Sequence, residues 1–462
     1  MDSVHNIAGD GYRLIVTRRN ASEILLAPQG SSWSLPSVEI LRGSRIAEQL
    51  TAELHVKWGC RGYCLFVPAV ARELPRCAVI EVVAHDDAPS AAACWIPLTT
   101  ATRSSIGSAD DRTIIEKSID ELNYYRREPN QGPFGRPGWL PELLEWVDQQ
   151  VAPLGLHATG GFTQLNAAPV FSLMRLETND SAVWFKATGE PNRHELPVAT
   201  RLARLFPGYV PRVLGVHTPW NGWLTQEVSG RSLDHFADLS AWTKTAEDLA
   251  RLQILSMGKQ TDLLEGHCKD LRLPRLAEQI DPFIERMREF MASQEKRTPA
   301  PLTNAELSRL GNHLKRACSS LCDARLPDAL GHLDFNPGNI FIAPERCVFL
   351  DWAEACVTNP LITFEYLREH FRRTYVSDST AMEHLVTAYL RPWRSVVSMN
   401  TLQQSASVSP LVAGFAYAAA TNAWRSSESL GQRSHAGYFR SLTRRMYREA
   451  EGMAPRSERC FV

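Results

Sequence analysis

Three residues between positions 334 and 351 have the types and spacing that phosphoryl transfer needs. Asp334 lies in the run His332-Leu-Asp-Phe-Asn-Pro-Gly-Asn, Asn339 follows five residues later, and Asp351 ends an apolar segment. Phosphoryl transfer needs a carboxylate that orients the attacking hydroxyl and oxygen ligands that hold Mg²⁺ against the nucleotide phosphates. We therefore predict that Asp334 accepts the proton of the acceptor hydroxyl and that Asn339 and Asp351 bind Mg²⁺.

The segment between Asn339 and Asp351 is expected to bring the second carboxylate back to the first. Residues 340–342 and 347–350 are apolar runs separated by Ala-Pro-Glu-Arg, a pattern typical of a β-hairpin. Asp, Asn, Pro and Gly also dominate ordinary turns, so any one of these residues taken alone would be interpreted as a turn residue. The joint pattern, with an Asp closing an apolar strand, favours a metal and phosphate site.

This stretch resembles the aminoglycoside phosphotransferase and choline kinase-like family, a branch of the protein-kinase-like fold. The family's His-x-Asp-x4-Asn and strand-then-Asp motifs match His332, Asp334, Asn339 and Asp351 position by position. The resemblance implies a supporting role for His332, ATP and Mg²⁺ as cofactors, and a bilobal fold with a small β-rich N-lobe and a large helical C-lobe. Trp352-Ala-Glu follows Asp351 in place of a protein-kinase continuation, which favours a small-molecule kinase.

Lys186, in an apolar run over residues 182–187, is the candidate ligand for the nucleotide phosphates. In the resembled fold, a strand lysine meets the α- and β-phosphates and a helix glutamate holds it, a role that Glu195 matches. Burying Lys186 beside ATP requires such a partner. Taken alone, Lys186 would be interpreted as a solvated lysine of an edge strand. No Gly-x-Gly-x-x-Gly precedes it, so phosphate contacts are expected from backbone groups and Ser172.

Two further strands are predicted over residues 209–215 and 222–230. The second resembles the family's hinge, where backbone groups near Glu227 and Val228 would pair with the edge of the base. Because main-chain pairing has no side-chain signature, the sequence does not decide between ATP and GTP. Helices are expected over residues 233–330 and from residue 359 onward.

Composition and charge limit which partners, cellular location and metal sites can be expected. Net charge is −1 and pI about 6.9, so there is no electrostatic case for nucleic acid or an anionic membrane as partner. Residues 1–6 lack a basic segment followed by an apolar one, and no uncharged apolar run has membrane-spanning length, so we expect a cytoplasmic protein. The pairs Cys60/Cys64 and Cys318/Cys322 have no partner pair at zinc-site distance and are interpreted as buried thiols.

Residues 12–100 are predicted to form a strand-rich α+β unit with one helix over residues 46–58. The strand order, the Trp33-Ser-Leu-Pro corner, the helix ending at Gly59 and the late Trp95-Ile-Pro-Leu run resemble a Nudix domain. An unrelated small α+β domain is the alternative.

The Nudix catalytic box, Gly-x5-Glu-x7-Arg-Glu-apolar-x-Glu-Glu-x-Gly, can be compared with this helix by spacing. Anchored on Gly59, the box keeps Glu53 and Leu54, but its first Gly, first Glu, Arg and Glu pair are replaced by Val38, Ser44, Ala52, Val56 and Lys57. A carboxylate Mg²⁺ site does not keep its affinity when Glu53 alone remains and a cation is added. We therefore predict a Nudix-like scaffold without hydrolase activity.

Residues 126–138 have linker composition, with three Pro and three Gly in thirteen residues. This favours a Nudix-like domain at residues 1–125 and a kinase domain at residues 139–462, divided into an N-lobe at about 139–230 and a C-lobe at about 231–462. An amphipathic helix is predicted directly after the linker, over residues 139–151. A fragment starting there is expected to fold by itself.

The pattern as a whole predicts an ATP-dependent kinase that transfers the γ-phosphoryl group to a hydroxyl of a small molecule. Two alternatives stay open: a nucleotide-binding pseudokinase or regulatory binding module, and a nucleotide hydrolase acting through the N-terminal domain. The intact set of kinase residues argues against the first, and the lost Glu pair argues against the second. The sequence does not indicate the oligomeric state.

The charge balance of the C-terminal half favours a neutral or anionic acceptor over a polycationic aminoglycoside. Residues 232–330 carry fifteen acidic and fourteen basic residues, and residues 368–462 carry thirteen Arg and no Lys against seven acidic residues. A polycation requires an excess of carboxylates, whereas Arg grips a carboxylate or phosphate in two-pronged fashion. These arginines could equally be solvated helix faces.

Overall fold

A computed structural model describes residues 9–453 except 43–44, 70, 72, 84–88, 90–92, 376–377 and 427–432. Ser44 and residues 1–6, on which two of the predictions above depend, lie outside the described residues. The chain has a mixed α+β fold and divides into two compact units. Unit 1 comprises Met1–Leu196 and Arg212–Glu227, and unit 2 comprises Pro197–Pro211 and Val228–Val462.

Unit 1 begins with a seven-stranded sheet in the order β3-β2-β1-β6-β5, in which β4 also pairs with β1 and β7 with β2. The only parallel pair among the described strands of this sheet is β1 with β6. The α+β layout predicted for residues 12–100 is therefore confirmed. The strands are β1 (Gly9–Arg18), β2 (Glu23–Gln29), β3 (Ser32–Ser34), β4 (Ser37–Leu41), β5 (Gly62–Phe66), β6 (Arg76–Val82) and β7 (Cys94–Pro97).

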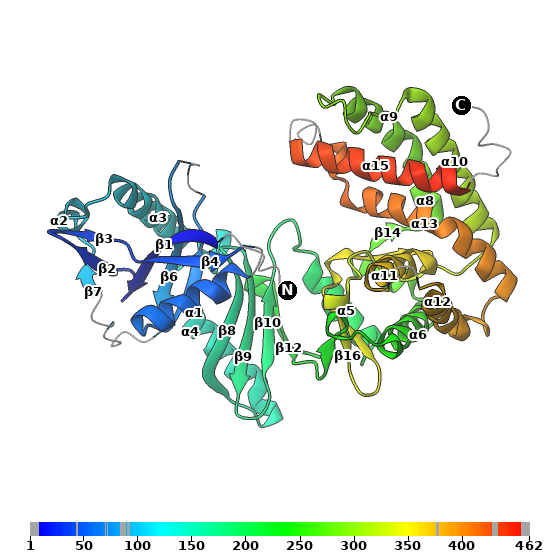
Figure 1. Ribbon diagram of the computed structural model, residues 1–462. Helices are drawn as coiled ribbons and strands as arrows, with labels where there is room; N and C mark the ends of the chain where they lie inside the picture. The colour runs from blue at the N-terminus through cyan, green and yellow to red at the C-terminus, as the bar shows by residue number, and fades with distance from the viewer. Residues whose placement is uncertain are drawn as a thin grey trace, which may run out of the picture. The chain divides into compact units, whose positions relative to one another are not determined.

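Helix α1 (Ile46–Trp58) has the predicted bounds because its sequence specifies both its face and its end. Ala47, Leu50, Leu54 and Trp58 recur at helical spacing and are buried. Gly59 ends the helix in the left-handed conformation, with φ 73°. Figure 1 shows α1 beside the strand β8 (Ala158–Ala168), which the contacts between the two elements confirm.

A second, antiparallel sheet of unit 1 has the order β11-β12-β10-β9-β8. Its other strands are β9 (Phe171–Thr178), β10 (Val183–Ala187), β11 (Val213–His217) and β12 (Gly222–Gln226). Helix α5 (Glu195–Leu205) follows β10. The strand predicted over residues 209–215 begins only at Val213, because Tyr209 and Val210 are buried in the core of unit 2.

The two sheets of unit 1 share one hydrophobic core, which also includes α3 (Ala109–Arg127) and α4 (Trp139–Val151). Phe134, within the predicted linker, is 1 % exposed and contacts Trp139, Phe185 and Trp220 edge-on. The side chain of Gln164 bonds both backbone groups of Cys64 across the two sheets. A fragment starting at residue 139 would lose this shared packing, and whether it folds alone stays a prediction.

The two compact units divide at other places than residues 126–138. The domain boundary and linker at residues 126–138 therefore stay a prediction. Short helices complete unit 1 beside the elements already given, including α2 (Thr100–Ser104).

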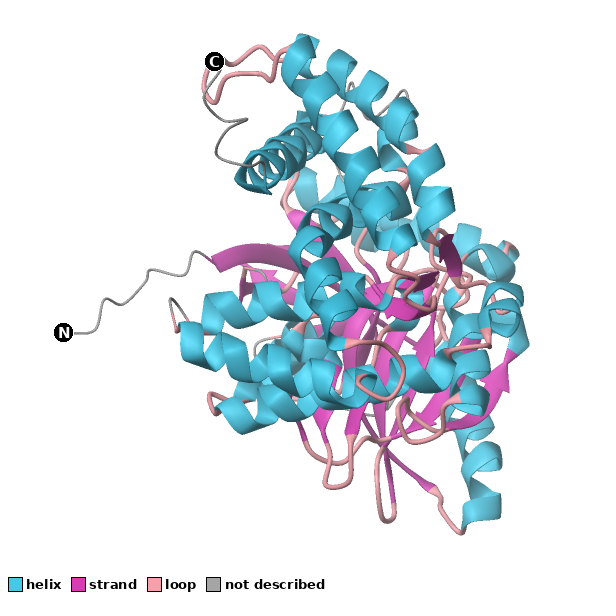
Figure 2. Ribbon diagram, turned by 90° about the vertical axis from the view of Figure 1, so that its right-hand side faces the viewer, coloured by secondary structure: helices cyan, strands magenta, loops and turns pink. Residues whose placement is uncertain are grey.

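Unit 2 is predominantly helical. Figure 2 shows the helices of the chain in cyan and its strands in magenta. Unit 2 also contains two three-stranded sheets, with the strand orders β13-β16-β17 and β14-β18-β15. The helices are α6 (Leu239–Ser256), α7 (Gln260–Glu265), α8 (Leu273–Glu278), α9 (Ile280–Ala292), α10 (Asn304–Asp323), α11 (Pro360–Thr374), α12 (Ser379–Trp393), α13 (Met399–Thr421) and α15 (Arg433–Met453). The strands are β13 (Arg231–Ser232), β14 (Lys269–Leu271), β15 (Ala329–His332), β16 (Ile340–Ile342), β17 (Cys347–Phe349) and β18 (Ala355–Thr358).

Strand β14 interrupts the region that we predicted to be helical from residue 233 to 330. It pairs in parallel with β18, from Lys269 opposite Cys356 to Leu271 opposite Thr358.

Within the described ranges, no helix is long and apolar enough to cross a membrane.

Candidate functional site

The predicted hairpin between Asn339 and Asp351 is confirmed. Strands β16 and β17 pair antiparallel, with Ile340 opposite Phe349 and Ile342 opposite Cys347. The Leu350 N–H donates to the Asn339 carbonyl at 2.8 Å, which extends this ladder by one step. The backbone therefore places Asn339 and the residue before Asp351 at the same end of the hairpin.

Asp334 lies in a loop that orients its carboxylate and leaves it exposed. The Asn336 amide donates to Oδ1 at 3.0 Å, and the Asn339 amide donates to the Asp334 carbonyl at 3.1 Å and to Oδ2 at 3.3 Å. The Gly338 N–H donates to Asn336 Oδ1 at 3.0 Å, which closes the turn around Pro337. The carboxylate is thus held by neutral donors and stays accessible to a substrate hydroxyl.

His332 connects this loop to the end of the hairpin. Its ring is buried, Nε2 lies 2.9 Å from the Leu350 carbonyl, and Nδ1 lies 3.2 Å from the Asp334 N–H. These partners assign the neutral tautomer in which Nε2–H donates to Leu350 and Nδ1 accepts from Asp334. Burial lowers the pKa of His332, which favours the same neutral form. The supporting role predicted for His332 therefore has a geometric basis.

Asp351 has a left-handed backbone, with φ 59° and ψ 64°. This conformation costs an L-residue about 1–2 kcal/mol, although Asp tolerates it better than most residues. The next residue is fixed, because the buried Trp352 indole donates to the Phe349 carbonyl at 2.8 Å. Strained backbone that its surroundings hold in place is concentrated at functional sites, which supports a special role for Asp351.

The donor set fits Mg²⁺, which prefers hard oxygen ligands and uses one or two carboxylates together with substrate phosphates. Asp351 supplies the carboxylate, and Asn339 supplies an amide oxygen. The Asn339 amide nitrogen faces Asp334, which turns its Oδ1 away from that residue. Among the described residues, no group of three or more His, Cys, Asp or Glu could hold a metal ion. The candidate site is of a different kind, because one of its ligands is the amide of Asn339.

Lys186 and Glu195 form the ion pair that we predicted. Lys186 Nζ lies 2.5 Å from Glu195 Oε1, and the two side chains are 17 % and 3 % exposed. Glu195 begins α5, and the Lys186 ammonium also lies 5.8 Å from the centre of the Trp223 ring. The role of this pair in binding a nucleotide stays a prediction.

Ser172 is not on the same face of the sheet as Lys186. Along β10, Phe185 and Ala187 point into the shared core, so Lys186 points to the other face. Ser172 pairs with Ala187, is fully buried, and its hydroxyl finds no partner among the described residues. Directly paired residues share a face, so the prediction of a phosphate contact from Ser172 was wrong.

Glu227 and Val228 lie where the chain leaves unit 1 for unit 2. The Glu227 carboxylate binds Arg175 Nε at 2.6 Å and Nη2 at 3.1 Å, and this hydrogen bonding holds the pKa of Glu227 below its ordinary value. The Glu227 N–H donates to the Ala182 carbonyl at 3.3 Å. Pairing of the remaining backbone groups with a base stays a prediction.

Glu53, the one carboxylate that remains in the segment compared with the Nudix box, pairs with a neighbouring cation on α1. Glu53 Oε2 lies 3.2 Å from Lys57 Nζ, the cation that replaces one of the box's glutamates.

Of the four cysteines interpreted as buried thiols, Cys60, Cys64 and Cys318 are buried, but Cys322 is exposed. Cys322 lies in the last turn of α10, outside the apolar stripe of that helix.

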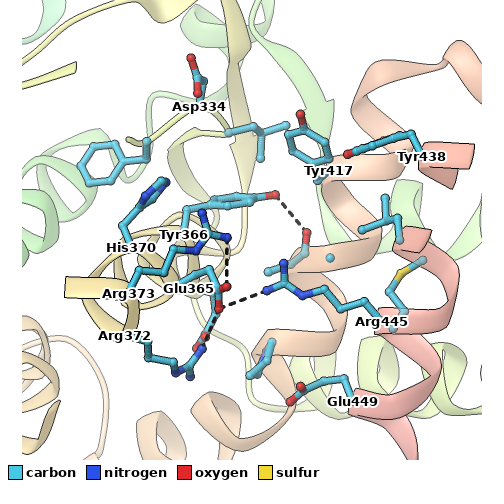
Figure 3. A pocket seen from close by; sticks show the side chains of 18 residues that line it. Asp334, Glu365, Tyr366, His370, Arg372, Arg373, Tyr417, Tyr438, Arg445 and Glu449 are labelled. Atoms are coloured by element: carbon cyan, nitrogen blue, oxygen red, sulfur yellow. Dashed lines mark hydrogen bonds and ion pairs between the residues drawn. The ribbon is translucent and has the colours of Figure 1, made fainter. Parts of the chain in front are cut away.

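Sequence reasoning did not find a cavity of about 350 Å³ that Asp334 lines in unit 2. Figure 3 shows the cavity with residues from α11, α13 and α15 around it. The only earlier signal was the excess of arginine in the C-terminal region. The charged and aromatic residues that line the cavity are Asp334, Phe335, Glu365, Tyr366, Glu369, His370, Arg372, Arg373, Tyr417, Tyr438, Arg445 and Glu449.

Residues 186–392 match the model of a family described as the phosphotransferase enzyme family. The match begins at the candidate lysine and includes Asp334, Asn339 and Asp351, but it spans a little under half of the chain. It does not reach the N-terminal sheet, so the likeness to a Nudix domain stays a prediction. Among curated proteins, none matches the chain.

Several solved structures are similar to the chain at low identity. A choline/ethanolamine kinase family protein from Mesorhizobium loti is 15% identical, with 68% of this chain and 96% of that chain covered and a TM-score of 0.45. The macrolide 2'-phosphotransferase MphH from Brachybacterium faecium is 16% identical (66% and 98% covered, TM-score 0.44). An aminoglycoside 2'-phosphotransferase-IIIa is 13% identical (66% and 98% covered, TM-score 0.45). Likeness of this degree does not indicate a substrate.

Proposed function

We propose that this protein is an ATP-dependent small-molecule kinase, which transfers the γ-phosphoryl group of ATP to a hydroxyl acceptor. The observation that carries the proposal is the arrangement of Asp334, Asn339 and Asp351 along one loop and hairpin, with His332 bonded to the backbone of Asp334 and of Leu350, the residue before Asp351. The match of residues 186–392 to a phosphotransferase family supports the same reaction class.

Each residue has a distinct role in this proposal. Asp334 orients the acceptor hydroxyl and accepts its proton as the bond to phosphorus forms. Asn339 and Asp351 hold Mg²⁺, which when bound supplies neutralisation of the phosphate charge. Lys186 pairs with the α- and β-phosphates while Glu195 keeps its ammonium in position. Backbone groups of Glu227 and Val228 pair with the base.

We further propose a bilobal protein-kinase-like fold for residues 139–462 and a Nudix-like scaffold without hydrolase activity at the N-terminus. The pairing of Glu53 with Lys57 supports the loss of activity, because the last box carboxylate has a cationic partner in place of a metal. A cytoplasmic location stays a prediction from the sequence.

The test is nucleotide binding by calorimetry together with a phosphoryl-transfer assay on wild type and Asp334→Asn. Because Asp334 touches the acceptor in this proposal, we expect the variant to bind Mg·ATP with wild-type affinity and to lose turnover. Binding without any turnover in the wild type, over a broad acceptor panel, would favour the pseudokinase alternative. Equal turnover in both proteins would exclude Asp334 as the base.

A further inference from the structure

The cavity beside Asp334 has a wall that carries three arginines. Arg372 and Arg373 come from the last turn of α11, and Arg445 comes from α15. Figure 3 shows Asp334 apart from these three residues, whose guanidinium groups turn toward a common point. The cavity therefore joins the candidate base at one place to a basic cluster at another.

The common point is the carboxylate of Glu369. It accepts hydrogen bonds from Arg372 Nη1 at 3.3 Å and from Arg373 Nη2 at 3.1 Å, and Arg445 Nη2 forms an ion pair with it at 3.1 Å. Three guanidinium groups thus share one carboxylate, which leaves this cluster with two positive charges in excess. Each guanidinium has five N–H donors in a fixed fork, so Glu369 occupies only a few of those present. Among the described residues these guanidinium groups have no other hydrogen-bond acceptor, and all three arginines are exposed, so their remaining donors can meet a ligand from the solvent.

This positive excess belongs to the cluster on Glu369 and not to the cavity as a whole, which Asp334, Glu365 and Glu449 also line. Glu365 is buried and engaged by Arg368 at 2.5 Å and by the Ser409 hydroxyl at 2.8 Å. Glu449, one turn after Arg445, forms no ion pair with a described residue and, like Asp334, keeps its negative charge, whereas Arg445 lies 3.1 Å from Glu369.

The titration of two neighbours agrees with a positive local potential. Burial raises the pKa of Glu369, but the guanidinium groups of Arg445, Arg373 and Arg372 outweigh it and hold that pKa below the ordinary value. Burial and Arg373 lower the pKa of His370, although Glu369 and Asp334 oppose them. His370 is therefore neutral near pH 7 and adds no charge of its own.

The rest of the lining is apolar and leaves room for a carbon skeleton. Tyr366, Tyr417 and Tyr438 form an aromatic series, with ring centres 6.2 Å and 6.5 Å apart. The Tyr366 hydroxyl is occupied, because it donates to the Ala413 carbonyl at 3.0 Å. Ala413 and Gly414 give this wall little side-chain bulk.

We propose that this cavity is the acceptor site and that Arg372, Arg373 and Arg445 bind an anionic group of the acceptor, a carboxylate or a phosphate. The placement of the acceptor hydroxyl at Asp334 rests on the proposed function, whereas the binding of an anion by the three arginines does not. In the transfer step, the acceptor oxygen bonds to the γ-phosphorus of ATP and the bond from that phosphorus to ADP breaks. The hydroxyl proton passes to Asp334.

The test measures binding to the full-length protein by calorimetry without nucleotide. The probes are glycerate and glycerol 3-phosphate, which combine hydroxyls with a carboxylate or a phosphate, and glycerol and choline as neutral and cationic counterparts. We expect at least one anion to bind, and Arg373→Gln and Arg445→Gln to weaken it about tenfold to a hundredfold, as expected for a lost charge-assisted hydrogen bond. Which anion binds tells a carboxylate site from a phosphate site.

Arg394→Gln is the matched control, because it removes the same charge from an exposed position of unit 2 outside the cavity. We expect it to bind the anion like wild type. Equal weakening by Arg394→Gln, tighter binding of choline, or no binding of either anion at millimolar concentration would overturn the inference. If the anion binds but Mg·ATP transfers no phosphate to any hydroxyl acceptor, the proposed function fails and the anion site stands.

Discussion

Replacing Glu195 by Gln tests the ion pair that is proposed to hold the nucleotide lysine. Removing one partner of a buried ion pair costs about 3–5 kcal/mol, whereas exposed pairs contribute about 1 kcal/mol or less. Glu195 is 3 % exposed and Lys186 17 % exposed, so the pair lies near the buried limit. We therefore expect Glu195→Gln to lower the free energy of unfolding by about 2–3 kcal/mol.

Mg·ATP binding should fall as well, because the Lys186 ammonium is no longer fixed by a carboxylate. A charge-assisted hydrogen bond contributes about 1.5–3 kcal/mol, so its loss weakens binding tenfold or more. Urea denaturation measures the stability and calorimetry measures the affinity.

Glu177→Gln is the control for this prediction. Glu177 lies 3.9 Å from Arg175 in an exposed pair of the same sheet, and its loss should change stability by about 0.5 kcal/mol or less. If Glu195→Gln behaves like Glu177→Gln in both measurements, the reasoning about Lys186 is refuted.

Three further predictions concern other parts of the chain. Asp351→Asn keeps a residue that tolerates the left-handed backbone but removes the negative charge. Calorimetry should therefore show the loss of Mg²⁺-dependent ATP binding, and unchanged affinity would place the metal elsewhere. Gln164→Ala leaves two backbone groups of the buried Cys64 without their side-chain partner and should destabilise the protein by about 2–4 kcal/mol in urea; a loss below about 0.5 kcal/mol would show that the two sheets are not coupled. Full-length Asp334→Asn should hydrolyse no nucleoside diphosphate derivative, and metal-dependent hydrolysis would show that the N-terminal unit is active.

The sequence predicted those elements whose signals are local. The helices at residues 46–58 and 139–151 have the predicted bounds, because apolar residues recur on one face in each. Strands β14 and β18 were missed, because three or four residues show no periodicity and their pairing joins segments far apart in the chain. Phe134 was missed for a different reason: a composition rich in Pro and Gly indicates a connection but not whether that connection is buried.

The site shows the same contrast. The hairpin and the contacts of Asn339 with Asp334 follow from residues close in sequence, and the ion pair of Lys186 was anticipated from a family resemblance. Ser172 was misplaced because strand register decides which face a side chain occupies, and register was not readable in advance. The arginine cluster on Glu369 joins two helices distant in sequence, so only the excess of arginine could be seen.

The central claim is transfer of a phosphoryl group to a small-molecule hydroxyl through Asp334. Its most direct test is to incubate a metabolite extract with Mg·ATP and either the wild type or Asp334→Asn, and to compare the products by mass spectrometry. We predict at least one compound that gains a single phosphate with the wild type and not with the variant. A phosphorylated product that appears equally with both proteins would contradict the claim, as would the absence of any such product beside confirmed Mg·ATP binding.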